Sequence, residues 1–218
     1  MTSFIAPEWD SSALVVIDVQ TEFVSGAMTV PGTADRIPAL GRLIAAFRTA
    51  GRPIVHVVRL YVPGGTDTDL PRRAEILAGR EVAAPGSDGA QIPAELLPHG
   101  ERLDSELLLA GGFQQIGPAE HILFKPRWSA FHRTDLEEHL HARGVTTVVV
   151  AGCNLPNCPR ATLFDASERD YRAVIVQDAT SQVTPERLHD LTLIGVNVSD
   201  VASVEQELAH SGESVDLG

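Results

Sequence analysis

Apolar runs of strand length alternate with segments of helical periodicity along most of this chain. Strands are predicted over residues 13–18, 53–58, 121–125, 145–151, 172–178 and 196–198, and helices over about 37–50, 70–77, 134–143, 158–170, 185–194 and 201–210. Strands that alternate with helices in this way form a parallel sheet covered on both faces. We therefore predict an α/β fold, a three-layer α/β/α arrangement around a mostly parallel, Rossmann-like sheet of about six strands.

The chain length of 218 residues suits a single domain over residues 1–218. Residues 59–118 differ from the rest because they are rich in Gly and Pro and contain only short helical pieces. A long excursion of this kind usually builds a lid or a pocket wall, so we interpret it as an insertion and not as a second domain. Residues 211–218 are expected to form a mobile tail.

The composition excludes several classes of partner. A net charge of −12 argues against nucleic acid or an anionic membrane surface. No signal sequence is evident and no apolar run is long enough to span a bilayer, so we expect a cytoplasmic protein without a membrane partner. Cys153 and Cys158 are the only cysteines, and because their spacing is not CxxC we expect two free thiols.

Cys158 lies at a predicted elbow between a strand and a helix. The strand ends near Ala151, the chain turns through Gly152 and Pro156, and Pro159 favours the first turn of a helix. Free N–H groups and the helix dipole at such a position stabilise a thiolate, which can lower a thiol pKa well below about 8.5. We therefore treat Cys158 as a candidate nucleophile; the alternative is a small buried apolar residue.

Residues of different chemistry end the other strands. Asp18, Lys125 and Asp178 each close a predicted strand. In open parallel sheets, ligands bind at the carboxyl ends of the strands. A carboxylate, a cation and the Cys158 thiol could thus converge on one point. Each could also be structural on its own, and Asp178 is interpreted as a helix cap or a residue behind the site.

Three separated segments share a pattern with a known superfamily. They are residues 13–23 (ALVVIDVQTEF), 124–131 (FKPRWSAF) and 151–158 (AGCNLPNC). In this order they resemble the hydrophobic-Asp-x-Gln-x-x-Phe, Lys-x-x-aromatic-Ser-Ala-Phe and Thr-Gly-x-x-Thr-x-x-Cys motifs of the isochorismatase-like cysteine hydrolases. That superfamily includes nicotinamidases, N-carbamoylsarcosine amidases and ureidoacrylate amidohydrolases.

The resemblance implies a catalytic triad and a thioester mechanism. Asp18 would be the acid and base, Lys125 would stabilise charge, and Cys158 would attack a carbonyl carbon. The resemblance also implies a cis peptide at Asn154–Leu155, with the N–H groups of Leu155 and Cys158 forming an oxyanion hole. The expected function is hydrolysis of a C–N bond in a small amide, a carbamoyl or ureido compound, a lactam or a cyclic imide.

The expected substrate contacts come from the same segments and from the excursion. They are Gln20, Phe23, Arg59, Tyr61, Trp128 and Phe131, with Leu155 as a further wall. The metal-binding Asp-x-His pattern of nicotinamidases has no counterpart after Val58, and His56 is expected to be buried, so no metal and no other cofactor are predicted. The resemblance also implies a homo-oligomer, a dimer or a tetramer.

Other functions remain open from the sequence. An isochorismatase of this fold cleaves a vinyl ether, a reaction that does not need the thiol of Cys158. A ligand-binding or redox-sensing protein could instead use Cys153 and Cys158 as a reversible disulfide. A dinucleotide-binding protein is disfavoured, because no Gly-x-Gly-x-x-Gly follows the first strand.

Overall fold

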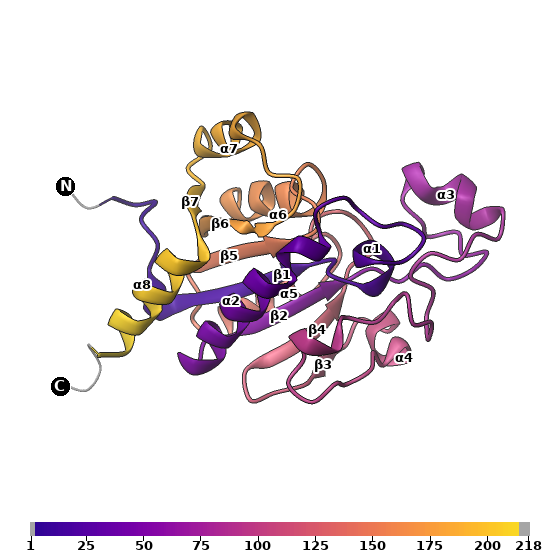
Figure 1. Cartoon of the computed structure of the whole chain (residues 1–218), viewed down its shortest axis with the longest axis horizontal. Helices are drawn as coiled ribbons and strands as arrows, with labels where there is room; N and C mark the ends of the chain where they lie inside the picture. Colours follow the sequence, from indigo (N-terminus) through magenta and orange to yellow (C-terminus); the bar gives the residue numbers. More distant parts are fainter. Residues whose placement is uncertain (1–2, 214–218) are drawn as a thin grey trace.

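The computed structural model describes residues 3–213, which are arranged around one seven-stranded sheet (Figure 1). Its order is β3-β4-β2-β1-β5-β6-β7, and every neighbouring pair is parallel except β3 and β4. The strands are β1 (Ser12–Ile17), β2 (Ile54–Val58), β3 (Phe113–Gln115), β4 (Glu120–Phe124), β5 (Thr147–Gly152), β6 (Arg172–Thr180) and β7 (Asn197–Ser199). The predicted α/β class and mostly parallel sheet are confirmed.

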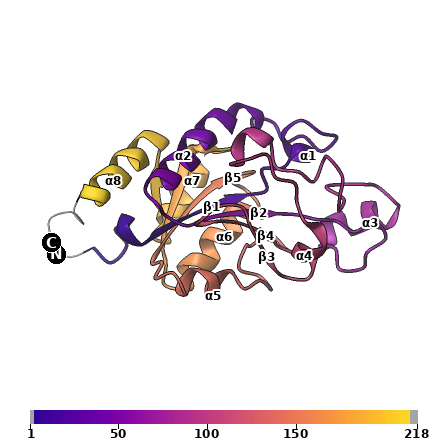
Figure 2. The same cartoon turned by 90° about the horizontal axis from the view of Figure 1, so that it is seen from below.

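Helices cover both faces of the sheet (Figure 2). They are α1 (Thr21–Val24), α2 (Ile37–Thr49), α3 (Leu70–Leu77), α4 (Ser105–Leu109), α5 (Leu136–His141), α6 (Cys158–Ser167), α7 (Pro185–Thr192) and α8 (Val201–Glu213). Helices α2 and α8 lie on one face, and α5 and α6 lie on the other. Helix α3 lies beyond the sheet, at the far end of the molecule from α8 (Figure 1). None of the helices within residues 3–213 is both long and apolar enough to cross a membrane.

The central strand β1 contributes to both cores, because successive side chains of a strand point to opposite faces. Leu14 and Val16 belong to the core under α2 and α8, and Val15 and Ile17 belong to the core under α5 and α6. All six residues of β1 are buried. This explains why β1 reads as a continuous apolar run and not as an alternating one.

Two sequence predictions need correction here. The seventh strand, β3, was not predicted, because it has only three residues and lies at the sheet edge next to a Gly pair. Helix α8 continues to Glu213, so residues 211–213 of the predicted mobile tail are helical. Residues 214–218 of that tail lie outside the described residues.

The last residue of β5 is a glycine whose position excludes a side chain. Gly152 has a φ angle of +120°, which residues with a Cβ rarely adopt. A Cβ at Gly152 would collide with Ile17 O and lie 2.8 Å from Ile17 N. The backbones of β1 and β5 therefore leave no room for a side chain at this position, just before the Cys158 elbow.

We expect Gly152→Ala to lower the free energy of unfolding by about 3 kcal/mol or more, because a backbone clash adds to an unfavourable φ angle. Urea denaturation measures this loss. Gly51→Ala is the matched control, because Gly51 also has a positive φ of +65° but has open space around its Cβ position. The control should lose only about 1–2 kcal/mol. Equal losses in the two variants would contradict the steric explanation.

Candidate active site

Four neighbouring strands end at the same edge of the sheet, and a chemically active side chain follows each of them. Asp18 follows β1, Arg59 follows β2, Lys125 follows β4 and Cys153 follows β5. A cavity of about 290 Å³ lies at this edge, in the place where open parallel sheets bind ligands. Ligand sites commonly measure about 300–1,000 Å³, so this cavity suits a small molecule.

Asp18 and Lys125 form a buried ion pair beside the cavity. Lys125 Nζ lies 2.8 Å from Asp18 Oδ2 and 3.3 Å from Arg127 O. Lys125 is completely buried, and Asp18 is 5% exposed. The second carboxylate oxygen, Asp18 Oδ1, is buried and has no hydrogen-bond partner among residues 3–213. The lysine thus holds one oxygen of Asp18 and leaves the other available as a proton acceptor.

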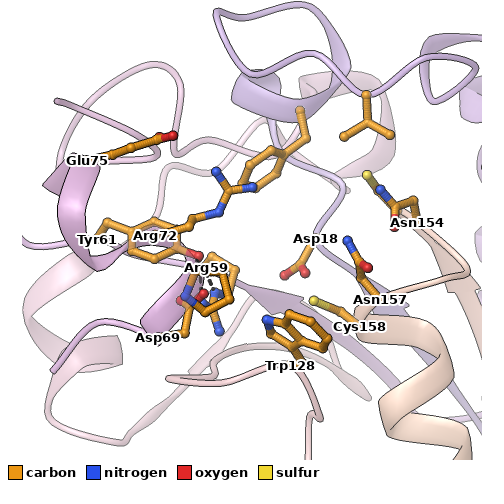
Figure 3. Close-up of a pocket in the computed structure, with 14 residues that line it drawn as sticks. Asp18, Arg59, Tyr61, Asp69, Arg72, Glu75, Trp128, Asn154, Asn157 and Cys158 are labelled. Carbon is orange, nitrogen blue, oxygen red and sulfur yellow. Dashed lines mark hydrogen bonds and ion pairs between the residues drawn. The ribbon is translucent and has the colours of Figure 1, made fainter.

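Cys158 is the first residue of α6 and lines the same cavity, facing Asp18 (Figure 3). Burial and the adjacent charge of Asp18 raise the pKa of the Cys158 thiol to about 12, although Lys125 and Arg59 act in the opposite direction. The sequence-based expectation of a lowered pKa is therefore wrong. The loss of water and the nearby carboxylate of Asp18 outweigh the positive charges of Lys125 and Arg59, so the raised pKa favours the neutral thiol.

The raised pKa predicts slow alkylation of Cys158 in the free protein. Only the thiolate reacts, and its fraction grows about tenfold per pH unit while the pH stays below the pKa. Alkylation by iodoacetamide at Cys158, followed by peptide mass mapping, should be slower than that of free cysteine at neutral pH. The rate should still rise between about pH 8 and pH 10. A plateau near neutral pH would show that the thiolate is already formed at rest.

The elbow before Cys158 differs from the sequence prediction by one residue. The cis peptide bond joins Cys153 and Asn154, not Asn154 and Leu155. The N–H group of Leu155 donates to Ser181 O at 3.0 Å, so it is not free for a substrate oxygen. The backbone N–H groups of Asn154 and Cys158 have no acceptor in the part of the chain that the structure describes.

Four of the predicted substrate contacts line the cavity, namely Phe23, Arg59, Tyr61 and Trp128. The other three do not line it. Gln20 is fully buried, and its amide donates to Arg59 O and Ala90 O and accepts from Arg59 N. Phe131 is buried in the core against Tyr171, and Leu155 is fully buried as well. These three side chains do not form the surface of the cavity, and Gln20 fixes the backbone of Arg59 beside it.

The excursion contributes charged residues that the sequence did not single out. Asp69, just before α3, is 5% exposed and pairs with the Arg59 guanidinium and the Tyr61 hydroxyl. Arg72 and Glu75, one helical turn apart on α3, also line the cavity. A Gly- and Pro-rich segment shows no periodicity that would locate such residues. The helical pattern of residues 70–77 predicts the helix itself. It does not predict which side chains of that helix face the cavity.

Two further predictions are confirmed. Asp178 Oδ1 accepts a hydrogen bond from Val201 N at 2.9 Å, so Asp178 caps the start of α8. His56 is 1% exposed, and its Nε2 lies 2.7 Å from Glu120 Oε1.

Within residues 3–213, no group of three or more His, Cys, Asp or Glu side chains is placed to hold a metal ion.

Comparison with known proteins now identifies the family. The isochorismatase domain model matches residues 12–106 and 109–206. A protein of Arabidopsis thaliana described as a probable inactive nicotinamidase is 33% identical over 94% of this chain and 100% of its own length. Ureidoacrylate amidohydrolase RutB of Methylobacterium radiotolerans is 31% identical over 94% of this chain and 82% of its own length.

A solved structure agrees with these relatives. An isochorismatase family protein from Desulfovibrio vulgaris superposes with a TM-score of 0.77 and 32% identity, covering 91% of this chain and 98% of that one. The fold is that of a three-layer α/β protein with a cavity at the carboxyl edge of its sheet. The chain belongs to the isochorismatase family, as the three sequence motifs indicated.

Proposed function

We propose that this protein is a cysteine-dependent hydrolase that cleaves a C–N bond in a small amide, carbamoyl or ureido compound or lactam. The observation that carries the proposal is the unpaired Oδ1 of Asp18, a residue that lines the same cavity as Cys158 and whose other oxygen, Oδ2, is bound by Lys125. A neutral thiol with a raised pKa needs a base close by, and this oxygen can serve as one. The named relative RutB, a ureidoacrylate amidohydrolase, supports the choice of bond.

In the first half of the proposed reaction, Asp18 Oδ1 removes the proton from Cys158 Sγ as the sulfur attacks the substrate carbonyl carbon. Lys125 stays bound to Oδ2 and offsets the change of charge on the carboxyl group. The developing oxyanion would be bound by the free N–H groups of Asn154 and Cys158. A single donor of this kind contributes about 2.7–4 kcal/mol in well-studied enzymes.

In the second half, the tetrahedral intermediate collapses and the C–N bond breaks. The protonated Asp18 gives its proton to the leaving nitrogen, which departs as ammonia or an amine and leaves a thioester on Cys158. Asp18 then accepts a proton from water, whose oxygen attacks the thioester carbon. The carboxylic acid product leaves, the proton returns to Cys158 Sγ, and the enzyme is restored.

The test is ammonia or amine release from a panel of primary amides, carbamoyl and ureido compounds, lactams and nicotinamide, measured with and without a chelator. We expect turnover of at least one compound, unchanged by the chelator, because the proposed chemistry uses only protein groups. Loss of turnover on chelation would overturn the metal-free mechanism. If a vinyl ether such as isochorismate is hydrolysed and none of the amides is, the reaction is ether cleavage and not the proposed C–N hydrolysis.

A further inference from the structure

The charged groups around the cavity are paired, with one exception. Asp18 pairs with Lys125, Asp69 pairs with Arg59, and Glu75 lies 3.5 Å from Arg80. The guanidinium of Arg72 makes no hydrogen bond or ion pair within residues 3–213. Its carbon lies 5.9 Å from the ring centre of Phe23 and 5.8 Å from that of Tyr61. One uncompensated positive charge thus faces the cavity of a protein whose net charge is −12.

Arg59 has a hydrogen-bond donor that lacks an acceptor among the described residues. The side chain is 3% exposed, its Nε and Nη2 contact Tyr61 and Asp69, and its Nη1 is buried with no partner among the described residues. A buried guanidinium N–H without an acceptor is costly, so such groups are usually satisfied by a ligand or by water. Arg59 lines the cavity, so a molecule bound there could supply the missing acceptor.

The two arginines lie away from the reactive groups. Figure 3 shows Arg59, Tyr61 and Asp69 at one end of the cavity and Asn154, Asn157 and Cys158 at the other, with Asp18 between them. Both guanidinium carbons lie within 6 Å of the Tyr61 ring centre, at 4.9 Å for Arg59 and 5.8 Å for Arg72. A molecule that reaches Cys158 with one end would therefore present its other end to the arginine pair.

We infer that the substrate carries a carboxylate, bound by Arg59 Nη1 and Arg72, at the end opposite to the scissile C–N bond. Planar guanidinium groups match the geometry of a carboxylate and bind it through charge-assisted hydrogen bonds. This inference rests on the proposed function and narrows it to short amido, carbamoyl or ureido acids. Neutral amides and cationic amides would leave Arg72 unpaired and the buried Arg59 Nη1 unsatisfied.

Binding to the Cys158→Ala protein tests the inference without requiring turnover. The probes are short monoamides of dicarboxylic acids, succinamate among them, each compared with its methyl ester by isothermal titration calorimetry. A charge-assisted hydrogen bond contributes about 1.5–3 kcal/mol, so at least one acid should bind about ten- to hundredfold more tightly than its ester. Equal or weaker binding of every acid would overturn the inference.

Variants then locate the carboxylate. In the Cys158→Ala background, Arg72→Met should reduce the preference for the acid over its ester about tenfold or more. Arg102→Gln is the matched control, because Arg102 is an exposed arginine of the same excursion that pairs with Asp88 away from the cavity, and it should keep the preference. Arg59→Lys retains the charge paired with Asp69 but loses the second nitrogen, and should also weaken binding of the acid.

The outcomes separate this inference from the proposed function. If wild-type enzyme hydrolyses panel amides but treats each acid and its ester alike, the inference fails and the hydrolase proposal stands. If acids bind preferentially through Arg72 and no compound is hydrolysed in a Cys158-dependent way, the carboxylate site stands and the hydrolase proposal fails. A preference that persists in Arg72→Met would overturn the assigned site. A preference that falls equally in Arg72→Met and Arg102→Gln would show a general charge effect and would also overturn it.

Discussion

Cys158→Ala is expected to reduce turnover of any amide substrate by about 10⁴- to 10⁶-fold, the range seen when a nucleophile that acts together with a base is removed. The side chain is small and lies at the start of α6, where alanine can occupy the same backbone position. The fold should therefore survive. Ammonia release gives the activity, and near-ultraviolet circular dichroism with a thermal melt checks that the variant is folded.

A folded Cys158→Ala protein that retains turnover would contradict the covalent mechanism and favour a reaction that needs no thiol, such as vinyl ether cleavage. Loss of turnover accompanied by unfolding would leave the role of the thiol untested in that variant. Cys158→Ser then tests the role of the thiol, because serine keeps a polar side chain of similar size and should preserve the fold. The far less acidic hydroxyl should still lower turnover by several orders of magnitude in a folded protein.

Lys125→Met is expected to remove both activity and stability. Lys125 is completely buried, and methionine fills a similar volume, but Asp18 would lose the one ion-pair partner that it has among residues 3–213. Leaving one charge of a buried pair uncompensated typically costs about 3–5 kcal/mol. Urea denaturation should show a loss of this size, and turnover should fall because the carboxylate is no longer held in its reactive position.

The double variant Asp18→Asn with Lys125→Met separates the two effects. With both charges removed, no buried charge remains unpaired, so much of the stability lost in Lys125→Met should return. Activity should not return, since asparagine cannot accept the thiol proton. A double variant as unstable as the single one would show that Lys125 stabilises the fold through packing and not through Asp18.

The fold could be predicted from the sequence because its central strands β1, β2 and β5 are buried on both faces. Runs such as Val148–Ala151 have no polar alternation, which indicates a parallel central strand, and the strand ends then gather Asp18 and Lys125. The cysteine could be found from the Pro-flanked elbow and the motif around it. Each of these patterns is local in sequence. The order of the strands in the sheet then brings the residues together at one edge.

The rest of the site depends on packing that a sequence does not display. Whether Cys158 has a raised or lowered pKa is decided by burial and by its separation from Asp18, and both are tertiary quantities. The roles of Asp69 and Arg72 depend on how residues 59–118 fold back over the sheet edge, where no periodic pattern guides them. Gln20 and Phe131 share motifs with Asp18 and Lys125, yet their side chains are buried and do not line the cavity.

Intact-mass spectrometry of the wild-type enzyme tests the central claim most directly. The enzyme is mixed with the amide that the panel shows to be hydrolysed fastest and is quenched in acid during turnover. We predict an added mass equal to the acyl part of the substrate, located on the peptide that contains Cys158, and its capture as a hydroxamate when hydroxylamine is present. Continued hydrolysis with an unmodified Cys158 and no hydroxamate would contradict the thioester mechanism.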